Sequence, residues 1–159
     1  MDTTSSVHSD NDKQIYFDDL NVGQIFRYGP YLVEEQELIA FNLKWDPLPI
    51  HLDDKAARAK GLLGKTASGQ FTLCVKQYFV NQTPWTDAVI GAMGFDEVRF
   101  PHPVYVGDEL FAEINVSALR ASRSKPDRGI VTLDFRLFNQ SDTTVLTYID
   151  TVMFARRAD

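Results

Sequence analysis

The stretch ASGQFTLCVKQYFVNQ, residues 67–82, has the pattern of a long amphipathic helix. Ser68 is a residue type that caps helix N-termini, and Gly69 falls in the first turn. Apolar side chains recur at the i, i+3, i+4, i+7 and i+8 positions that share one helix face, namely Phe71, Cys74, Val75, Tyr78 and Phe79. We therefore predict a central helix that begins at Ser68 and buries this face, with Cys74 in the core rather than acting as a nucleophile.

Beyond Pro84 the pattern changes to an alternation of apolar and polar residues, which is typical of strands with one buried face. Residues 24–33 are also strand-like, but Gly29 and Pro30 interrupt them, so we expect an edge or bent strand there. This order predicts an α+β fold in which a curved antiparallel sheet wraps around one long helix. The four later strand segments are residues 88–106, 108–122, 129–140 and 143–157.

The bulk composition narrows the class of protein. A chain of 159 residues favours one domain, predicted over residues 15–159 after a polar tail at residues 1–14. Its net charge of −6 disfavours binding to nucleic acid, and no apolar run approaches the ~20 residues that span a bilayer. With a single cysteine and no signal-peptide pattern at the start, a cytoplasmic protein is expected.

The segment WDPLPIHLDD, residues 45–54, follows a predicted helix at residues 34–45. Pro47 and Pro49 end that helix and stiffen the loop that separates Asp46 from His51. An acid and a base held on a rigid loop can touch the same water molecule and move a proton. Alternatively, Asp46 caps a turn and His51 makes a structural hydrogen bond, and the residues alone leave both interpretations open.

A second candidate component is Gly69. An unblocked N–H in the first turn of a helix can bind a carbonyl oxygen that gains negative charge, although glycine there could instead allow a close backbone approach. An acid and base loop and an oxyanion-binding helix end are the two parts needed to add water across a carbon–carbon double bond conjugated to a carbonyl. A metal site is disfavoured, because no second histidine lies at a ligand spacing from His51.

A basic group surrounds the predicted hairpin near residue 125. Arg123, Lys125 and Arg128 form either a solvated turn or a site for the phosphates of a large anionic ligand.

Several motifs in series give the chain a family resemblance. They cover most of residues 16–157 and read YFDDLNVGQIF, DPLPIHLD, TASGQFT, VRFPHPVYVGDEL, SRSKPDRGIV and FNQ. With these motifs the chain resembles the MaoC-like dehydratases, in the hotdog-fold group that includes (R)-specific enoyl-CoA hydratases. The resemblance favours the catalytic interpretation of Asp46 and His51 over the structural one.

The resemblance implies a single hotdog domain that pairs with a second copy, as a homodimer or higher homo-oligomer, with the site near the interface. Asp46 and His51 would hold a water that adds to a trans-2-enoyl thioester of CoA, giving the (R)-3-hydroxyacyl product. The N–H of Gly69 would bind the thioester oxygen, and no cofactor is needed.

Two positions depart from the family pattern. Leu48 stands where hydratases commonly have asparagine, and Ser68 stands where many have histidine, so both are assigned to the substrate-binding part of the site. One alternative is a hotdog thioesterase, but such enzymes commonly carry a carboxylate on the central helix, and residues 68–82 contain none. The other alternative is a non-catalytic acyl-thioester binding subunit of a mixed assembly.

Overall fold

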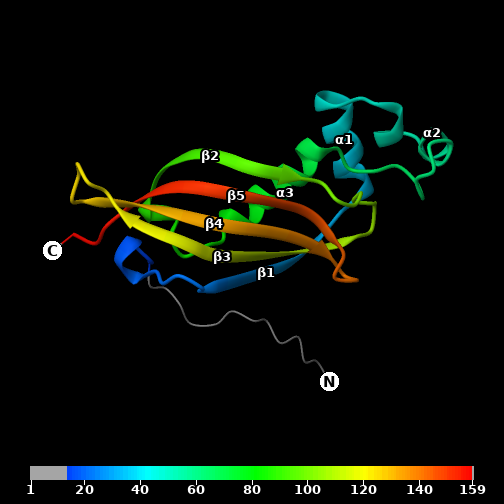
Figure 1. The fold of residues 1–159 in the computed structure, drawn as a ribbon. Helices are drawn as coiled ribbons and strands as arrows, with labels where there is room; N and C mark the ends of the chain where they lie inside the picture. The colour runs from blue at the N-terminus through cyan, green and yellow to red at the C-terminus, as the bar shows by residue number, and fades with distance from the viewer. Residues whose placement is uncertain (1–13, 159) are drawn as a thin grey trace, which may run out of the picture.

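A computed structural model of the chain describes residues 14–158. The predicted polar tail therefore lies outside the described residues, apart from Gln14. Five antiparallel strands form one sheet that curves around helix α3 (Gly69–Val80), as Figure 1 shows. The predicted α+β architecture is confirmed. In their order across the sheet the strands are β1 (Ile25–Leu32), β3 (Glu109–Ala121), β4 (Arg128–Asn139), β5 (Thr144–Ala155) and β2 (Val89–Arg99).

The core lies between α3 and the concave face of the sheet. Phe71, Val75 and Phe79 of α3 are at most 3% exposed, as the helical periodicity predicts. The prediction was wrong for Cys74, which is exposed, and for Tyr78, whose side chain is 50% exposed. The sheet covers a face of the helix that is rotated from the predicted one toward Thr72 and Lys76, which are also buried. Phe71, Val75 and Phe79 belong to both faces, so the apolar spacing alone does not distinguish them.

Prolines determine where the two edge strands are irregular or end. β1 is an edge strand, as predicted, and its register against β3 shifts between Tyr28 and Tyr31, where Pro30 has no N–H to donate. The predicted strand at residues 88–106 was too long, since β2 ends at Arg99. Pro101 and Pro103 follow within four residues, and neither can donate to a strand ladder.

The remaining elements surround the two ends of α3. Beyond its N-terminal end lie α1 (Glu35–Trp45), the short turn η2 (Pro49–His51) and α2 (Asp54–Arg58), at the right of Figure 1. The short turns η1 (Phe17–Asp19) and η3 (Thr86–Ala88) complete the described elements. Within residues 14–158 no helix has the length and apolar character needed to cross a membrane.

Candidate active site

The last turn of α1 and the turn η2 bring Asp46 and His51 to face each other. The helix ends at Trp45, and the N–H of Asp46 donates to the carbonyl of Asn42 at 3.0 Å. Pro47 prevents another helical turn, while the N–H of His51 donates to the carbonyl of Leu48 at 2.9 Å and closes η2. The prolines of this loop therefore fold the chain back on itself, which returns His51 to the end of the helix that carries Asp46.

The two side chains approach without bonding directly. The Nε2 atom of His51 lies 3.7 Å from the Oδ2 atom of Asp46, and the Asp46 side chain is 31% exposed whereas that of His51 is 10% exposed. This separation is longer than a hydrogen bond, which for N–H···O spans about 2.7–3.2 Å. A single water about 2.8 Å from each atom fits the separation, because such a water can bond both groups at once.

The backbone of Thr66 determines how the His51 ring is oriented. The Nδ1 atom of His51 lies 2.9 Å from the carbonyl oxygen of Thr66 and 3.0 Å from its Oγ1 atom. A carbonyl oxygen only accepts, so Nδ1 carries the proton and neutral His51 has its free lone pair on Nε2. The acceptor nitrogen therefore faces Asp46, which is the arrangement that a general base needs.

The segment before α3 is fastened to the same loop. The N–H of Thr66 donates to the carbonyl of Ile50 at 3.1 Å, and the N–H of Ala67 donates to the carbonyl of Val104 at 2.9 Å. These bonds connect the segment that carries His51, the start of α3 and the loop after β2. Thr66, which orients the His51 ring, precedes Gly69 at the start of α3 by three residues, so the helix end is held close to the ring.

The N-terminus of α3 has the predicted cap. Ser68 is fully buried, and its Oγ accepts a hydrogen bond from the N–H of Phe71 at 3.2 Å. The hydroxyl thus serves the helix end and is not exposed in the single chain. Among the described residues, the N–H of Gly69 has no hydrogen-bond acceptor, and it lies at the positive end of the helix dipole.

Phe100 covers the Cα of Gly69. A methyl group added at Gly69 would meet the Phe100 ring at 3.0 Å from its Cζ atom, and the Phe100 side chain is 47% exposed. Glycine therefore allows close packing of this ring and is not needed for an unusual backbone angle, so a larger residue there would require the ring to shift slightly. Sequence reasoning did not single out Phe100, because only the fold brings it to the start of α3.

The remaining predicted site residues separate into two groups. Asp46 and His51 together are called the dyad. Leu48 lies between them in the loop and is 51% exposed, so it stays close to the candidate site. Arg123, Lys125 and Arg128 belong to the β3–β4 hairpin at the opposite end of the sheet from α1 and α2, as Figure 1 shows. Arg128 pairs with Asp127 there, with Nε 2.8 Å from Oδ1. Within one chain the structure does not bring this group to the dyad.

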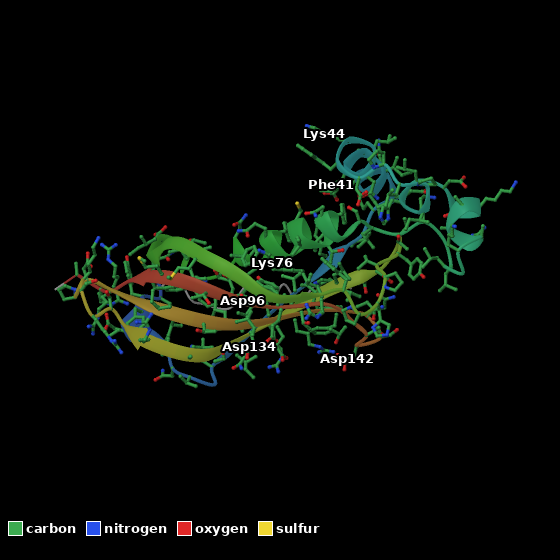
Figure 2. The ribbon with its side chains drawn as sticks, turned by 45° about the horizontal axis from the view of Figure 1, so that its top comes forward. Phe41, Lys44, Lys76, Asp96, Asp134 and Asp142 are labelled. Carbon is green, nitrogen blue, oxygen red and sulfur yellow. The ribbon has the colours of Figure 1, made fainter. Side chains whose placement is uncertain are left out.

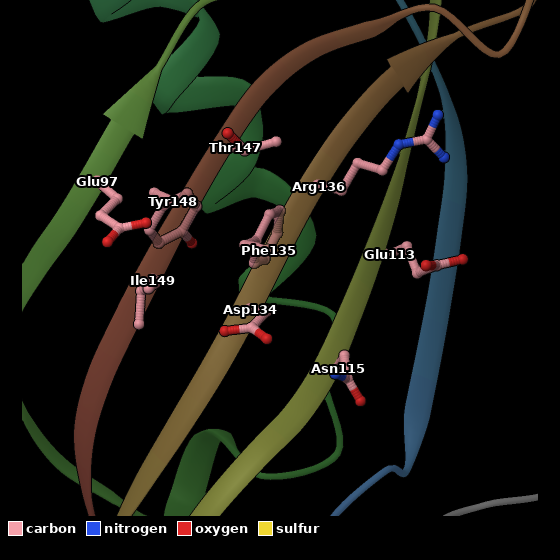
Figure 3. A pocket seen from close by; sticks show the side chains of 9 residues that line it. All are labelled: Glu97, Glu113, Asn115, Asp134, Phe135, Arg136, Thr147, Tyr148 and Ile149. Atoms are coloured by element: carbon pink, nitrogen blue, oxygen red, sulfur yellow. The ribbon is translucent and has the colours of Figure 1, made fainter.

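A hollow on the outer face of the sheet is separate from this site. Figure 3 shows Glu113, Asp134 and Arg136 on the face of the strands that is turned away from α3, whereas Phe135 and Tyr148, which also border the hollow, are buried in the core. It opens on the other side of the sheet from the helix whose N-terminus borders the dyad loop. No group of three or more ligand-type side chains that could hold a metal ion occurs within residues 14–158.

A charged pair that sequence reasoning missed is buried beneath α3. Lys76 is 3% exposed and Asp150 is 8% exposed, and Figure 2 labels Lys76 between the helix and the sheet. The Nζ atom of Lys76 lies 4.4 Å from the ring centroid of Phe95 and 5.2 Å from that of Tyr148. The signal for this pair was an aspartate at an inward-facing position of β5, two residues after Tyr148.

Burial shifts the ionisation of both members of the pair. It lowers the pKa of Lys76, against the opposing effect of the Asp150 charge. It raises the pKa of Asp150 to about 6, although the Lys76 charge partly offsets this rise. The Oδ1 atom of Asp150 is also buried without a hydrogen-bond partner among the described residues.

Asp150 is expected to make the stability of the protein fall as the pH rises from about 4 to about 6. Its folded pKa exceeds the ordinary value of 3.8, so the folded protein binds this proton more tightly than the unfolded chain and loses the advantage as the proton leaves. The shift corresponds to roughly 2–3 kcal/mol. Urea unfolding across this range should show Asp150→Asn gaining stability relative to the wild type as the pH rises. A difference independent of pH, or equal to that of the exposed control Asp134→Asn, would contradict this.

The geometry describes a protein with a helix wrapped by a sheet and with an Asp and His pair at the start of that helix. A MaoC-like domain model matches residues 20–135. The chain belongs to the MaoC-like domain family, and its fold is the hotdog fold. At the level of the family it is a member of a hydratase and dehydratase group.

Known proteins support this placement. An uncharacterized protein of Bacillus subtilis, YdeM, is 27% identical over 129 residues, which cover 80% of this chain and 90% of that protein. The crystal structure of a MaoC-like dehydratase from Rhodospirillum rubrum is similar with a TM-score of 0.85 and 34% identity, over 91% of this chain and 99% of that one.

Two further structures are informative. An (R)-hydratase from A. caviae involved in PHA biosynthesis has a TM-score of 0.68 and 31% identity, over 84% of this chain and 96% of that one. A conserved hypothetical protein from Mycobacterium tuberculosis with a double hotdog fold has a TM-score of 0.79 and 27% identity. That match covers 92% of this chain but only 46% of the other.

Proposed function

We propose that the protein is a hydratase and dehydratase that adds water reversibly to a trans-2-enoyl thioester of CoA and gives the (R)-3-hydroxyacyl product. The observation that carries the proposal is the orientation of His51. Its Nδ1 atom is occupied by the carbonyl of Thr66, and its Nε2 atom lies 3.7 Å from the Asp46 carboxylate. The MaoC-like dehydratase and (R)-hydratase neighbours support the same class of reaction.

The water bound between the two side chains is the nucleophile. His51 Nε2 accepts a proton from it, while the Asp46 carboxylate accepts a hydrogen bond from its other O–H and stabilises the imidazolium that forms. The water oxygen bonds to the β-carbon of the enoyl group, and the π electrons of the double bond move to the thioester oxygen as an enolate. When these electrons return, the α-carbon takes up the proton that the His51 imidazolium holds. The elements of water are then added across the double bond, and the Asp46 and His51 side chains return to their starting protonation states.

The N–H of Gly69 stabilises the enolate. It has no acceptor within the described part of the chain, and the dipole of α3 favours negative charge at this end. A donor fixed in advance toward a developing oxyanion contributes about 3 kcal/mol of barrier lowering. The Phe100 ring against Gly69 provides an apolar surface beside the bound thioester.

The direct test is an assay with trans-2-enoyl-CoAs of different length and branching, followed by the loss of enoyl absorbance. We expect turnover with at least one of them and a product of (R) configuration. Release of free thiol without hydration would instead indicate a thioesterase. Binding of every thioester without turnover would indicate a binding subunit and would contradict the proposal.

The active form is a homodimer that pairs through β2. This strand is at the edge of the sheet and exposes Ile90, Met93 and Phe95, whose side chains are 46%, 57% and 47% exposed. An unpaired, apolar edge strand favours pairing with another chain, and the other edge carries Pro30. The double hotdog protein from M. tuberculosis supports the pairing, because this chain matches only about half of it.

Antiparallel pairing of two β2 strands would place the β3–β4 hairpin of one copy at the same end of the joint sheet as the dyad of the other. In that arrangement Arg123, Lys125 and Arg128 of the partner copy are the candidates to bind the phosphates of CoA. Light scattering should give twice the mass of the chain, and Met93→Glu should reduce it to that of a monomer. A wild-type protein that remains monomeric at micromolar concentration would contradict the dimer.

A further inference from the structure

Asn42 makes contacts that connect both members of the dyad. It lies on α1 one helical turn before Asp46, and it is fully buried. Its carbonyl oxygen accepts from the N–H of Asp46 at 3.0 Å. Its side-chain Nδ2 donates to the carbonyl of His51 at 3.2 Å and to the carbonyl of Thr66 at 3.4 Å. One residue is therefore bonded to the backbones of Asp46, His51 and Thr66.

The bond to Thr66 is made to the same oxygen that orients the imidazole. The carbonyl oxygen of Thr66 accepts from His51 Nδ1 at 2.9 Å, and an oxygen with two lone pairs can also accept the Nδ2 bond of Asn42. Asn42 thereby holds the acceptor of the ring in place, and through the carbonyl of His51 it also holds the backbone that carries the ring. Rotation of the imidazole would break the hydrogen bond between Nδ1 and the Thr66 carbonyl, whose position is fixed by Asn42.

The orientation of the Asn42 carboxamide is set by its neighbours. Turned over, its Oδ1 atom would face two carbonyl oxygens and repel both, so Nδ2 occupies that position. In this orientation Oδ1 is buried and has no hydrogen-bond partner within the described residues. A buried acceptor without a partner destabilises a fold. The carboxamide therefore donates to the carbonyls of His51 and Thr66, although this leaves its own Oδ1 atom without a partner.

We propose that Asn42 is a positioning residue that holds the His51 ring in the Nδ1–H tautomer with Nε2 directed at Asp46. The proposal rests on the proposed hydration reaction for its kinetic consequence, but not for its consequence for the ring itself. Asn42 does not reach the reacting atoms, and it acts only through the carbonyls of His51 and Thr66.

The experiment compares Asn42→Ala and Asn42→Leu with the wild type. Leu has the same number and branching of side-chain heavy atoms as Asn without its donors, so it separates the lost hydrogen bonds from the cavity that Ala leaves. Thr83→Val is the matched control, because Thr83 is also buried and donates to a backbone carbonyl, that of Val80 at the far end of α3. Each variant is measured by thermal unfolding, by enoyl-CoA kinetics and by ¹⁵N NMR of the His51 ring above pH 8, assigned with His51→Gln.

We expect the wild-type ring to show a protonated Nδ1 and an unprotonated Nε2, and both Asn42 variants to show a mixture of the two tautomers. Their kcat should fall about 10- to 100-fold with KM nearly unchanged, as for a misplaced catalytic group. Thr83→Val should keep the tautomer and the kcat, whatever its stability. A single Nδ1–H tautomer in folded Asn42→Ala or Asn42→Leu would overturn the proposal. Because the NMR result does not depend on turnover, a wild type without activity would overturn the proposed function and not this inference.

Discussion

The variants Asp46→Asn and His51→Ala are each expected to lower the kcat for hydration of an accepted enoyl-CoA by about 10²- to 10⁴-fold. The amide of Asn cannot stabilise an imidazolium with a charge, and Ala removes the Nε2 atom that accepts the proton. The two residues act on one water, so the double variant should lose little more than either single variant. The kcat of each variant is measured from initial rates of enoyl absorbance loss, and circular dichroism confirms that each variant is folded.

The control for these variants is Asp53→Asn. Asp53 lies two residues after His51 and caps α2, accepting from the N–H of Ala56 at 2.7 Å. Asn caps a helix about as well, so this change removes a charge from the same segment with little effect on the fold. Equal losses in Asp53→Asn and Asp46→Asn, or no loss in folded His51→Ala, would show that the dyad does not perform the reaction.

A comparison of Gly69→Pro with Gly69→Ala should isolate the contribution of one backbone N–H. Proline is tolerated at the first position of a helix, and Ser68 before it has φ −67° and ψ 157°, a conformation that a following proline accepts. Only the proline variant lacks the N–H. We expect Gly69→Pro to lower kcat by roughly 10²- to 10³-fold, which is the cost of losing an oxyanion donor.

Gly69→Ala is the matched control for that comparison. Both variants add a Cβ that meets the Phe100 ring at 3.0–3.4 Å, and this half-exposed ring can shift to accept it. Alanine keeps the N–H, so its kcat should stay within a few-fold of the wild type, and thermal unfolding should show similar stability for the two variants. Equal activity of folded Gly69→Pro and Gly69→Ala would remove Gly69 from the mechanism.

Local chemistry explains how much of the fold was predictable. Pro47 ends α1, Ser68 caps α3 and Pro30 disturbs β1 through groups that lie within a few residues of them in the chain. Such effects do not require knowledge of the rest of the protein. The period-two pattern likewise located the strands, and it failed after Arg99, where prolines interrupt a segment of similar composition.

The features that could not be predicted depend on contacts between distant segments. Cys74 and Lys76 lie on opposite sides of the stripe that Phe71, Val75 and Phe79 form on α3. The position of the helix against the sheet decides that Lys76 is buried and Cys74 is exposed. Asn42 looked like an ordinary polar residue of α1, because its partner Thr66 is 24 residues away. Nothing in the sequence indicates how far the hairpin that carries Arg123 lies from the dyad. That distance depends on the order of the strands in the sheet, which the sequence pattern does not give.

The proposed mechanism is tested most directly by a crystal structure of the Asp46→Asn variant with a bound enoyl-CoA. We expect the β-carbon to lie beside residue 46 and the Nε2 atom of His51, and the thioester oxygen to accept from the N–H of Gly69 at about 2.9 Å. A thioester bound with its double bond away from His51, or with its oxygen turned away from the start of α3, would contradict the assignment of this site.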